Sequence, residues 1–399
     1  MTVETGADLT TNGAAFIIDE GNTKKSWIGP PITNQFLAPI PQANGDVTFA
    51  VQGTGIFKRI TSGTYGDYDI LPSDVVYRYD LGLQGCHYHG NTVAVPSGVF
   101  VTWTFDYYIS PDAANYPTAN FLANVEGPGS LGIAAPNSNK GVWQSIKATS
   151  ALTTSSGNSN ILLYPGACNN SFLASSGYML YKNPQVTFTT YNPTSGIPFV
   201  DGTRSNAQAI LEMTTGRTLT ANNLVYAANN TYSFNGTNSS LDFSTTGFNM
   251  ATGQTIIMVL KPTEADGNRR NPYNHAYGGF GTITHETGGD FNYFHGTNGG
   301  DGVPYQGTIS SFTVAQNETA MITVSRGPST VRWYKNGVFS NSDPNLYPTA
   351  VTSTSTAKIG SGYAGFFQGD IEFVAIYNRQ LSDNEVNGIY NGLKTRFSI

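Results

Sequence analysis

The stretch at residues 369–397, "GDIEFVAIYNRQLSDNEVNGIYNGLKTRF", decides the fold, because it joins a strand to a helix in a chain that otherwise consists of short apolar runs and turns. Ser382 lies three residues before Glu385, which is the spacing of a helix-capping box. The apolar stripe at helical spacing consists of Val386, Ile389, Tyr390 and Leu393. We predict a closing strand followed by a helix that covers one end of a β-sandwich, with Gly392 weakening or ending the helix.

The rest of the chain has the composition of an all-β protein. Its 399 residues include 45 glycines and 20 prolines, and only 12% are charged. Residues 98–109 alternate apolar and polar side chains, which places Trp103 in a core, and Trp333 lies in phase with apolar neighbours in the same way. Turn signals recur about every ten residues, a spacing typical of sandwiches. We therefore predict an all-β fold of two β-sandwich (jelly-roll) domains in tandem.

Composition shifts suggest where these domains begin and end. We predict an extended, proline-containing N-terminal arm over residues 1–45, a first sandwich over 46–195, a linker over 196–230 and a second sandwich over 231–399. Within the linker, residues 205–213 are compatible with a short helix.

Prolines in the arm exclude a helix and disfavour a central strand. The arm either covers its own domain or docks onto a partner, and the sequence leaves both interpretations open. Trp27, Pro30 and Pro31 are the candidate anchors, because an isolated Trp in an extended segment is suited to a hydrophobic pocket.

Charge and hydropathy exclude several functions. The net charge is −6 and the densest basic spots are "TKK" and "NRR", so we expect no nucleic-acid binding. No apolar run is long enough to span a membrane, and the N-terminus lacks the features of a signal peptide. We therefore expect synthesis in the cytoplasm without a leader. Cys86 and Cys168 form no disulfide framework, and two thiols are favoured over a bridge.

Three patches resemble the laminin-G/concanavalin A-like lectin jelly roll. They are "YSFNGTNSSLDF" at 232–243, "VRWYKNGVFS" at 331–340 with its Asn336-Gly337 hairpin signal, and the strand and helix that begin at Gly369. The resemblance implies this fold for the C-terminal domain.

Three other segments, at 17–34, 178–188 and 198–214, resemble structural proteins of tailed-phage virions. This resemblance implies a fibre, tail or head-surface component that is made in the host cytoplasm and resides in the virion. It also implies that the first sandwich, over 46–195, is similar to carbohydrate-binding modules. It implies that the N-terminal arm binds other virion proteins, and we expect a homo-oligomer.

The sequence offers few acids for catalysis. Glycoside hydrolysis needs two carboxylates that flank the scissile bond. Asp370 and Glu372 are the nearest in-phase pair, but Val374 follows where a third acid would stand, and Asp19 and Glu20 project to opposite faces. We predict that the protein is not an enzyme. A polysaccharide-degrading enzyme is the alternative.

Two stretches could hold metals. The loop at 284–302 supplies Glu286, Asp290 and Asp301 as candidate Ca²⁺ ligands, although we expect no required cofactor. The segment "CHYH" contains Cys86, His87 and His89, which are either transition-metal ligands or surface histidines in a turn.

Aromatic and polar residues in the loop-rich stretch 271–306 are candidates for glycan binding, because sugars stack on aromatic rings. Alternating aromatics in a sandwich are also typical core residues, so both interpretations remain. Attachment to host-surface glycans is the predicted function, and an architectural decoration protein without glycan binding is the alternative. The candidates are Tyr273, Tyr277, Tyr293, Phe294, His295 and Tyr305.

Overall fold

The computed structural model describes two compact units. The described residues are 13–22, 25–36, 40–41, 46–48, 50–52, 57–81, 88–114, 121–134, 139–164, 176–194, 196–228, 231–264 and 267–399. The C-terminal unit combines the described parts of Met1–Pro30, Ser205–Tyr226 and Thr231–Ile399. The N-terminal unit combines those of Pro31–Arg204 and Ala227–Asn230. The fold is all-β, as predicted.

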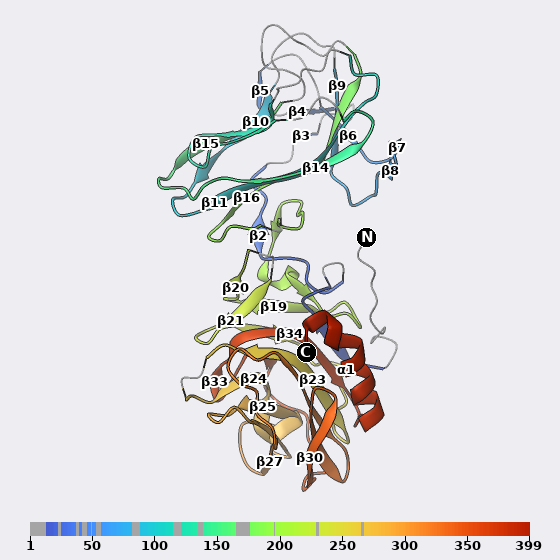
Figure 1. Ribbon diagram of the computed structural model, residues 1–399, viewed down its shortest axis with the longest axis vertical. Coiled ribbons are helices and arrows are strands. Elements are labelled where there is room, and N and C mark those ends of the chain that lie inside the picture. Colours follow the sequence, from blue (N-terminus) through green and yellow to red (C-terminus); the bar gives the residue numbers. More distant parts are fainter. Residues whose placement is uncertain are drawn as a thin grey trace. The chain divides into compact units, whose positions relative to one another are not determined.

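The C-terminal unit is a sandwich of two sheets (Figure 1). The first sheet has the order β20-β21-β34-β23-β28-β29-β30, with β1 beside β34, and the second has the order β18-β19-β22-β31-β24-β25-β26-β27, with β32 and β33 beside β24. Side chains of both sheets share one apolar core, which includes Ile256, Tyr273 and the predicted Trp333. The strands of the first sheet are β1 (Phe16–Asp19), β20 (Val225–Tyr226), β21 (Tyr232–Asn235), β23 (Gln254–Pro262), β28 (Ala320–Arg326), β29 (Thr330–Lys335), β30 (Val338–Pro344) and β34 (Gln368–Tyr377). Those of the second are β18 (Ile210–Leu211), β19 (Thr218–Asn222), β22 (Ser240–Phe243), β24 (Arg270–His275), β25 (Gly281–His285), β26 (Phe291–Gly296), β27 (Tyr305–Ile309), β31 (Ala357–Ile359), β32 (Ser361–Gly362) and β33 (Gly365–Phe366).

The predicted hairpin between β29 and β30 is confirmed. Asn336 and Gly337 both have positive φ, at 49° and 74°. This is the backbone conformation of a two-residue turn that matches strand twist, and Asn-Gly tolerates it best.

The closing strand and helix are also confirmed. Helix α1 (Asp383–Phe397) begins after Ser382, whose hydroxyl accepts from Glu385 N–H in a capping box. The helix continues through Gly392 instead of ending there. Its buried residues Val386 and Ile389 pack on the outer face of the first sheet, against side chains of β23 and β34. Figure 1 shows helix α1 beside these strands. The helix therefore covers a sheet face, where the sequence predicted an end of the sandwich.

Of the two interpretations of the N-terminal arm, the structure supports the one in which the segment packs on its own domain, for the described residues up to Pro30. Strand β1 pairs antiparallel with β34, from Phe16 opposite Ile376 to Asp19 opposite Phe373. Trp27 is 1% exposed and its ring lies 4.9 Å from that of Tyr232 in the same unit. The candidate anchor thus fills a pocket of its own unit. Pro30 is buried and Pro31 half-buried, so neither presents a free docking surface.

The predicted domain limits differ from the compact units for the same reason. Residues 205–226, expected as linker, contribute β18, β19 and β20 to the C-terminal unit. The helix expected at 205–213 is only a single turn, Asn206–Gln208, because Ile210 and Leu211 pair with β19. Strand pairing outweighs weak local helix propensity here.

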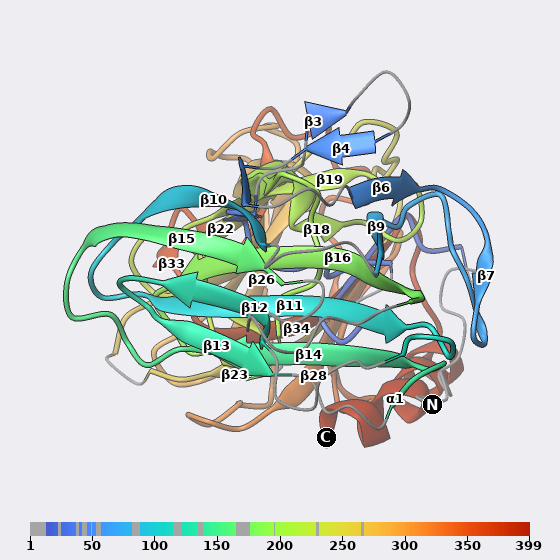
Figure 2. The same ribbon diagram turned by 90° about the horizontal axis from the view of Figure 1, so that it is seen from above.

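The N-terminal unit is a second sandwich. One sheet has the order β13-β12-β15-β10-β5, and the other has the order β14-β11-β16-β9-β6-β4-β3; Figure 2 shows β14, β11 and β16 side by side. Trp103, predicted as core, is 0% exposed between the sheets. Cys86, His87 and Cys168 lie outside the described residues, and of the "CHYH" segment only the backbones of Tyr88 and His89 are described, in β10. The strands are β2 (Ile32–Thr33), β3 (Ile40–Pro41), β4 (Asp46–Thr48), β5 (Ala50–Gln52), β6 (Phe57–Ile60), β7 (Thr64–Tyr65), β8 (Tyr68–Asp69), β9 (Val76–Asp80), β10 (Tyr88–Val95), β11 (Phe100–Ile109), β12 (Phe121–Glu126), β13 (Leu131–Ala134), β14 (Trp143–Thr149), β15 (Gly157–Leu163), β16 (Tyr178–Thr189) and β17 (Thr203–Arg204).

Candidate functional site

Four aromatic rings meet at the surface of the C-terminal unit and form what we call the aromatic cluster: Tyr277, Phe294, Tyr305 and Tyr363. The ring of Tyr277 lies 4.9 Å from those of both Tyr305 and Tyr363, in edge-to-face contacts. Phe294 lies 5.9 Å from Tyr305 and 6.1 Å from Tyr363. Tyr305 is 40% exposed and Tyr363 is 41% exposed. Mutual packing fixes the rings while leaving surface accessible to a ligand.

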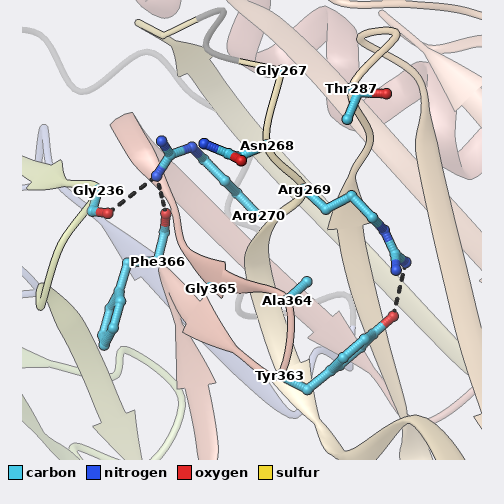
Figure 3. Close-up of a pocket in the computed structure, with 10 residues that line it drawn as sticks. All are labelled: Gly236, Gly267, Asn268, Arg269, Arg270, Thr287, Tyr363, Ala364, Gly365 and Phe366. Atoms are coloured by element: carbon cyan, nitrogen blue, oxygen red, sulfur yellow. Dashed lines mark hydrogen bonds between the residues drawn. The ribbon is translucent and has the colours of Figure 1, made fainter.

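A polar pocket of about 700 Å³ adjoins the aromatic cluster and shares Tyr363 with it (Figure 3). Strands β24 and β33 of the second sheet form part of its walls, and they pair in parallel at Asn271 and Phe366. Its lining residues are Gly236, Gly267, Asn268, Arg269, Arg270, Thr287, Tyr363, Ala364, Gly365 and Phe366.

Arg269 connects the pocket to the aromatic cluster. Its Nε lies 2.7 Å from Glu286 Oε2, and its Nη2 donates to Glu286 Oε1 at 3.1 Å and to the Tyr363 hydroxyl at 3.0 Å. The guanidinium carbon lies 5.9 Å from the ring centroid of Phe294 and 5.6 Å from that of Tyr363, within cation–π range. These contacts hold an otherwise flexible side chain in one position.

Arg270 has a structural role in the same pocket. Its Nη1 donates to the carbonyl oxygens of Gly236 at 3.1 Å and Phe366 at 2.8 Å (Figure 3). Its Nη2 lies 3.0 Å from Glu264 Oε2. The guanidinium thereby joins two walls of the pocket, and its charge is compensated by a carboxylate.

The structure divides the predicted glycan-binding residues into two groups. Tyr277, Phe294 and Tyr305 belong to the aromatic cluster, so they remain candidates. Tyr273, Tyr293 and His295 are at most 1% exposed, and a sugar cannot reach them. The prediction is wrong for these three, because they occupy the inward-facing positions of β24 and β26.

The predicted Ca²⁺ ligands do not come together. The described residues contain no group of three or more His, Cys, Asp or Glu side chains that could hold a metal ion. Glu286 pairs with the guanidinium of Arg269. Asp301 Oδ1 accepts from the backbone N–H of Tyr277 at 3.0 Å, and Asp290 accepts from Glu286 N–H only through its carbonyl oxygen at 2.8 Å.

The acids considered for hydrolysis lie in the first sheet. Asp370 and Glu372 lie on β34, and the carbonyl oxygen of Glu372 accepts from Glu20 N–H at 2.9 Å. Burial raises the pKa of Glu20 to about 8, with smaller contributions from the neighbouring carboxylates, and burial also raises the pKa of Asp370 and of Glu372. The N-terminal segment thus places a third acid beside the pair, which the sequence pattern of β34 alone did not contain.

Sequence reasoning missed Arg269 and Tyr363 as site residues. Both lie in segments that the sequence marks: Arg269 in the basic "NRR" spot, and Tyr363 in the middle of the glycine-rich "GSGYAG" turn. A large aromatic at the tip of a glycine-rich turn has few neighbours to bury it, which is the signal that could have identified Tyr363.

The sequence of this unit carries a family signature that agrees with its sandwich. Residues 234–387 match the model of the concanavalin A-like lectin/glucanases superfamily. The C-terminal unit is therefore a laminin-G/concanavalin A-like jelly roll, as the sequence patches suggested, and both the aromatic cluster and the pocket lie within the matched residues.

Solved structures resemble the chain distantly. The receptor-binding domain of botulinum neurotoxin D matches with a TM-score of 0.38 and 12% identity, covering 48% of this chain and 52% of that chain. The botulinum neurotoxin serotype G binding domain matches with a TM-score of 0.35 and 14% identity, covering 46% and 48%. A Ruminococcus gnavus sialidase module, CBM40, bound to α2,3-sialyllactose, matches with a TM-score of 0.30 and 15% identity, covering 36% and 84%. The chain thus spans about half the length of the toxin domains that it matches. No curated protein matches the sequence.

None of the helices among the described residues has the length and apolar character needed to cross a membrane.

Proposed function

We propose that the C-terminal unit binds glycans at the aromatic cluster and the adjoining pocket. The observation that carries this proposal is the joint exposure of Tyr305 and Tyr363 beside a polar cavity, since most large aromatics of the unit are buried in its core. Sugar-binding sites need this combination, because the C–H faces of a pyranose pack on rings while its hydroxyls bond to polar side chains.

The geometry suits an oligosaccharide better than a small apolar ligand. The pocket is open and polar, with Asn268, Arg269 and Thr287 at its rim and glycine backbone between them. The aromatic cluster extends from it across β26 and β27. One sugar ring can therefore occupy the pocket while the next packs on the cluster.

A glycan array probed with the full-length chain tests the proposal. We expect specific binding that falls at least about tenfold when Tyr305→Ala and Tyr363→Ala are combined, because two stacking surfaces are lost. Phe339→Ala is the matched control, since Phe339 is an exposed aromatic of the same unit on β30. Absence of binding to any glycan, or equal binding by the double variant, would contradict the proposal.

We further propose that this binding serves attachment of a virion. The support is the sequence resemblance of residues 17–34, 178–188 and 198–214 to structural proteins of tailed phages. Immunogold labelling of particles with an antibody to this chain should decorate the virion surface, and the double variant should adsorb poorly to host cells. A decoration protein without glycan binding would instead lose particle stability on mutation while adsorption stayed normal.

We propose a binding protein and not a hydrolase. A reducing-sugar assay on host polysaccharides checks this, with Asp370→Asn and Glu372→Gln as the variants. Release of reducing ends by the wild type, abolished in either variant, would instead identify a polysaccharide-degrading enzyme.

A further inference from the structure

The chemistry of the pocket narrows the class of sugar that it fits, and this inference rests on the glycan binding proposed above. We propose that the pocket recognises a sugar that carries a carboxylate, with Arg269 and Tyr363 as the groups that hold it.

Glu286 orients Arg269 so that one edge of the guanidinium remains available. A guanidinium has five N–H donors. Nε and Nη2 are engaged by Glu286 and Tyr363, at distances between 2.7 and 3.1 Å. Nη1 has no hydrogen-bond partner among the described residues, and the side chain of Arg269 is 40% exposed. A ligand therefore meets a cation that is already held in place and has two N–H groups left to donate.

Tyr363 supplies a second donor beside the first. Its hydroxyl oxygen accepts from Arg269 Nη2, so its own proton is available to a ligand. Burial is the main cause that raises the pKa of Tyr363, and the Glu286 carboxylate adds to it, so the hydroxyl keeps its proton at neutral pH. The hydroxyl oxygen lies 3.0 Å from Arg269 Nη2, the nitrogen that shares the guanidinium carbon with Nη1.

The donor pattern favours a carboxylate over a sugar hydroxyl. Two adjacent donors match a group that has two acceptor oxygens and no proton of its own, and bonds between charged partners are the stronger ones. The residues that line the pocket include two arginines and Asn268, with no Asp or Glu among the ten. The two nearby acids, Glu286 and Glu264, lie outside this lining, and each is paired with one of the two arginines.

Glycan-array binding by the full-length chain tests this inference when the array holds matched sugars: uronic-acid and nonulosonic-acid oligosaccharides, their methyl esters, sulfated oligosaccharides and neutral ones. We expect binding to the free acids and a loss of at least about tenfold for the methyl esters, since esterification removes the charge and keeps the sugar. Selective binding of neutral or sulfated glycans would overturn the inference and leave the proposed function standing. Binding of none would overturn both.

Two variants locate the interaction. Arg269→Gln and Tyr363→Phe should each weaken binding of the acidic oligosaccharide by about tenfold, and Tyr363→Phe should leave neutral stacking unchanged because it keeps the ring. Lys394→Gln, on helix α1, removes the same charge from another part of the unit and should have no effect. If Arg269→Gln unfolds the unit, Tyr363→Phe and the ester comparison still decide. Equal affinity for acid and ester, or an unaffected Tyr363→Phe, would contradict the assignment.

Discussion

At the residue scale, two buried histidines make the stability of the C-terminal unit sensitive to acid. His275 and His295 are 0% exposed, the Nδ1 of each has no partner among the described residues, and burial lowers the pKa of both to about 4. Arg326 lowers the pKa of His295 further, and Asn345 opposes this through a hydrogen bond. In the folded state both histidines have a pKa below the ordinary value of 6.5. The contribution of the two neutral histidines to stability is therefore present above pH 6.5 and is lost as the pH falls toward 4. Replacing His295 with Gln should therefore reduce the loss of unfolding free energy between pH 7 and pH 5 by about 1–2 kcal/mol. Urea denaturation at the two pH values measures this, and an unchanged difference would refute it.

Glu20 should have the opposite pH dependence. Its Oε1 accepts from Tyr232 N–H at 2.6 Å, and burial raises its pKa to about 8. A raised folded-state pKa stabilises the fold fully below the ordinary value of 4.5, and this contribution is lost as the pH rises toward 8. Replacing Glu20 with Gln keeps the acceptor and removes the titration. Relative to this variant, the wild type should lose about 2 kcal/mol of unfolding free energy between pH 5 and pH 7. Urea denaturation measures this difference. An equal change in unfolding free energy for the two proteins between pH 5 and pH 7 would contradict the raised pKa of Glu20.

At the element scale, strand β1 is an integral part of the C-terminal sandwich. Phe16 is 0% exposed and stacks on Phe243 with ring centroids 4.3 Å apart. Truncation of a buried Phe typically costs about 3–5 kcal/mol, so Phe16→Ala should destabilise the unit by that amount. Lys25→Ala, at an exposed position of the same segment, is the control and should change stability by less than about 0.5 kcal/mol. Chemical denaturation measures both. If Phe16→Ala were as stable as the wild type, β1 would not be part of the sandwich and the segment would be an undocked arm.

The contrast between β1 and α1 shows which elements a sequence can reveal. The helix was predictable because its signals are local: Ser382 and Glu385 cap it, and its apolar stripe repeats within four turns. The partner of β1 lies at the other end of the chain, on β34. No short-range pattern encodes such a pairing, so the prolines that follow β1 suggested an extended arm instead.

At the scale of the whole molecule, the candidate site depends on sheet order, which explains why only part of it was predictable. Tyr277 and Tyr305 belong to one aromatic-rich stretch and could be proposed from it. Tyr363 joins them only because β33 returns to pair with β24, almost a hundred residues away in sequence, next to Arg269. The inward or outward direction of Tyr293 and Phe294 likewise follows from strand register, which the structure provides.

The chain leaves the C-terminal unit after Pro30 and returns to it at Ser205, so the main part of the N-terminal unit, Pro31–Arg204, is an insertion. The two crossing points lie close together, because Ile32 pairs with Arg204 in the β2–β17 ladder. Replacement of residues 31–204 by a short Gly-Ser linker should therefore preserve the thermal unfolding transition of the C-terminal unit and its glycan binding. Removal of residues 1–204 should abolish both, because β1 and the buried Trp27 are lost. Calorimetry and the glycan array measure the two deletions side by side. If residues 205–399 alone folded cooperatively while the internal deletion aggregated, the N-terminal segment would not be part of this unit.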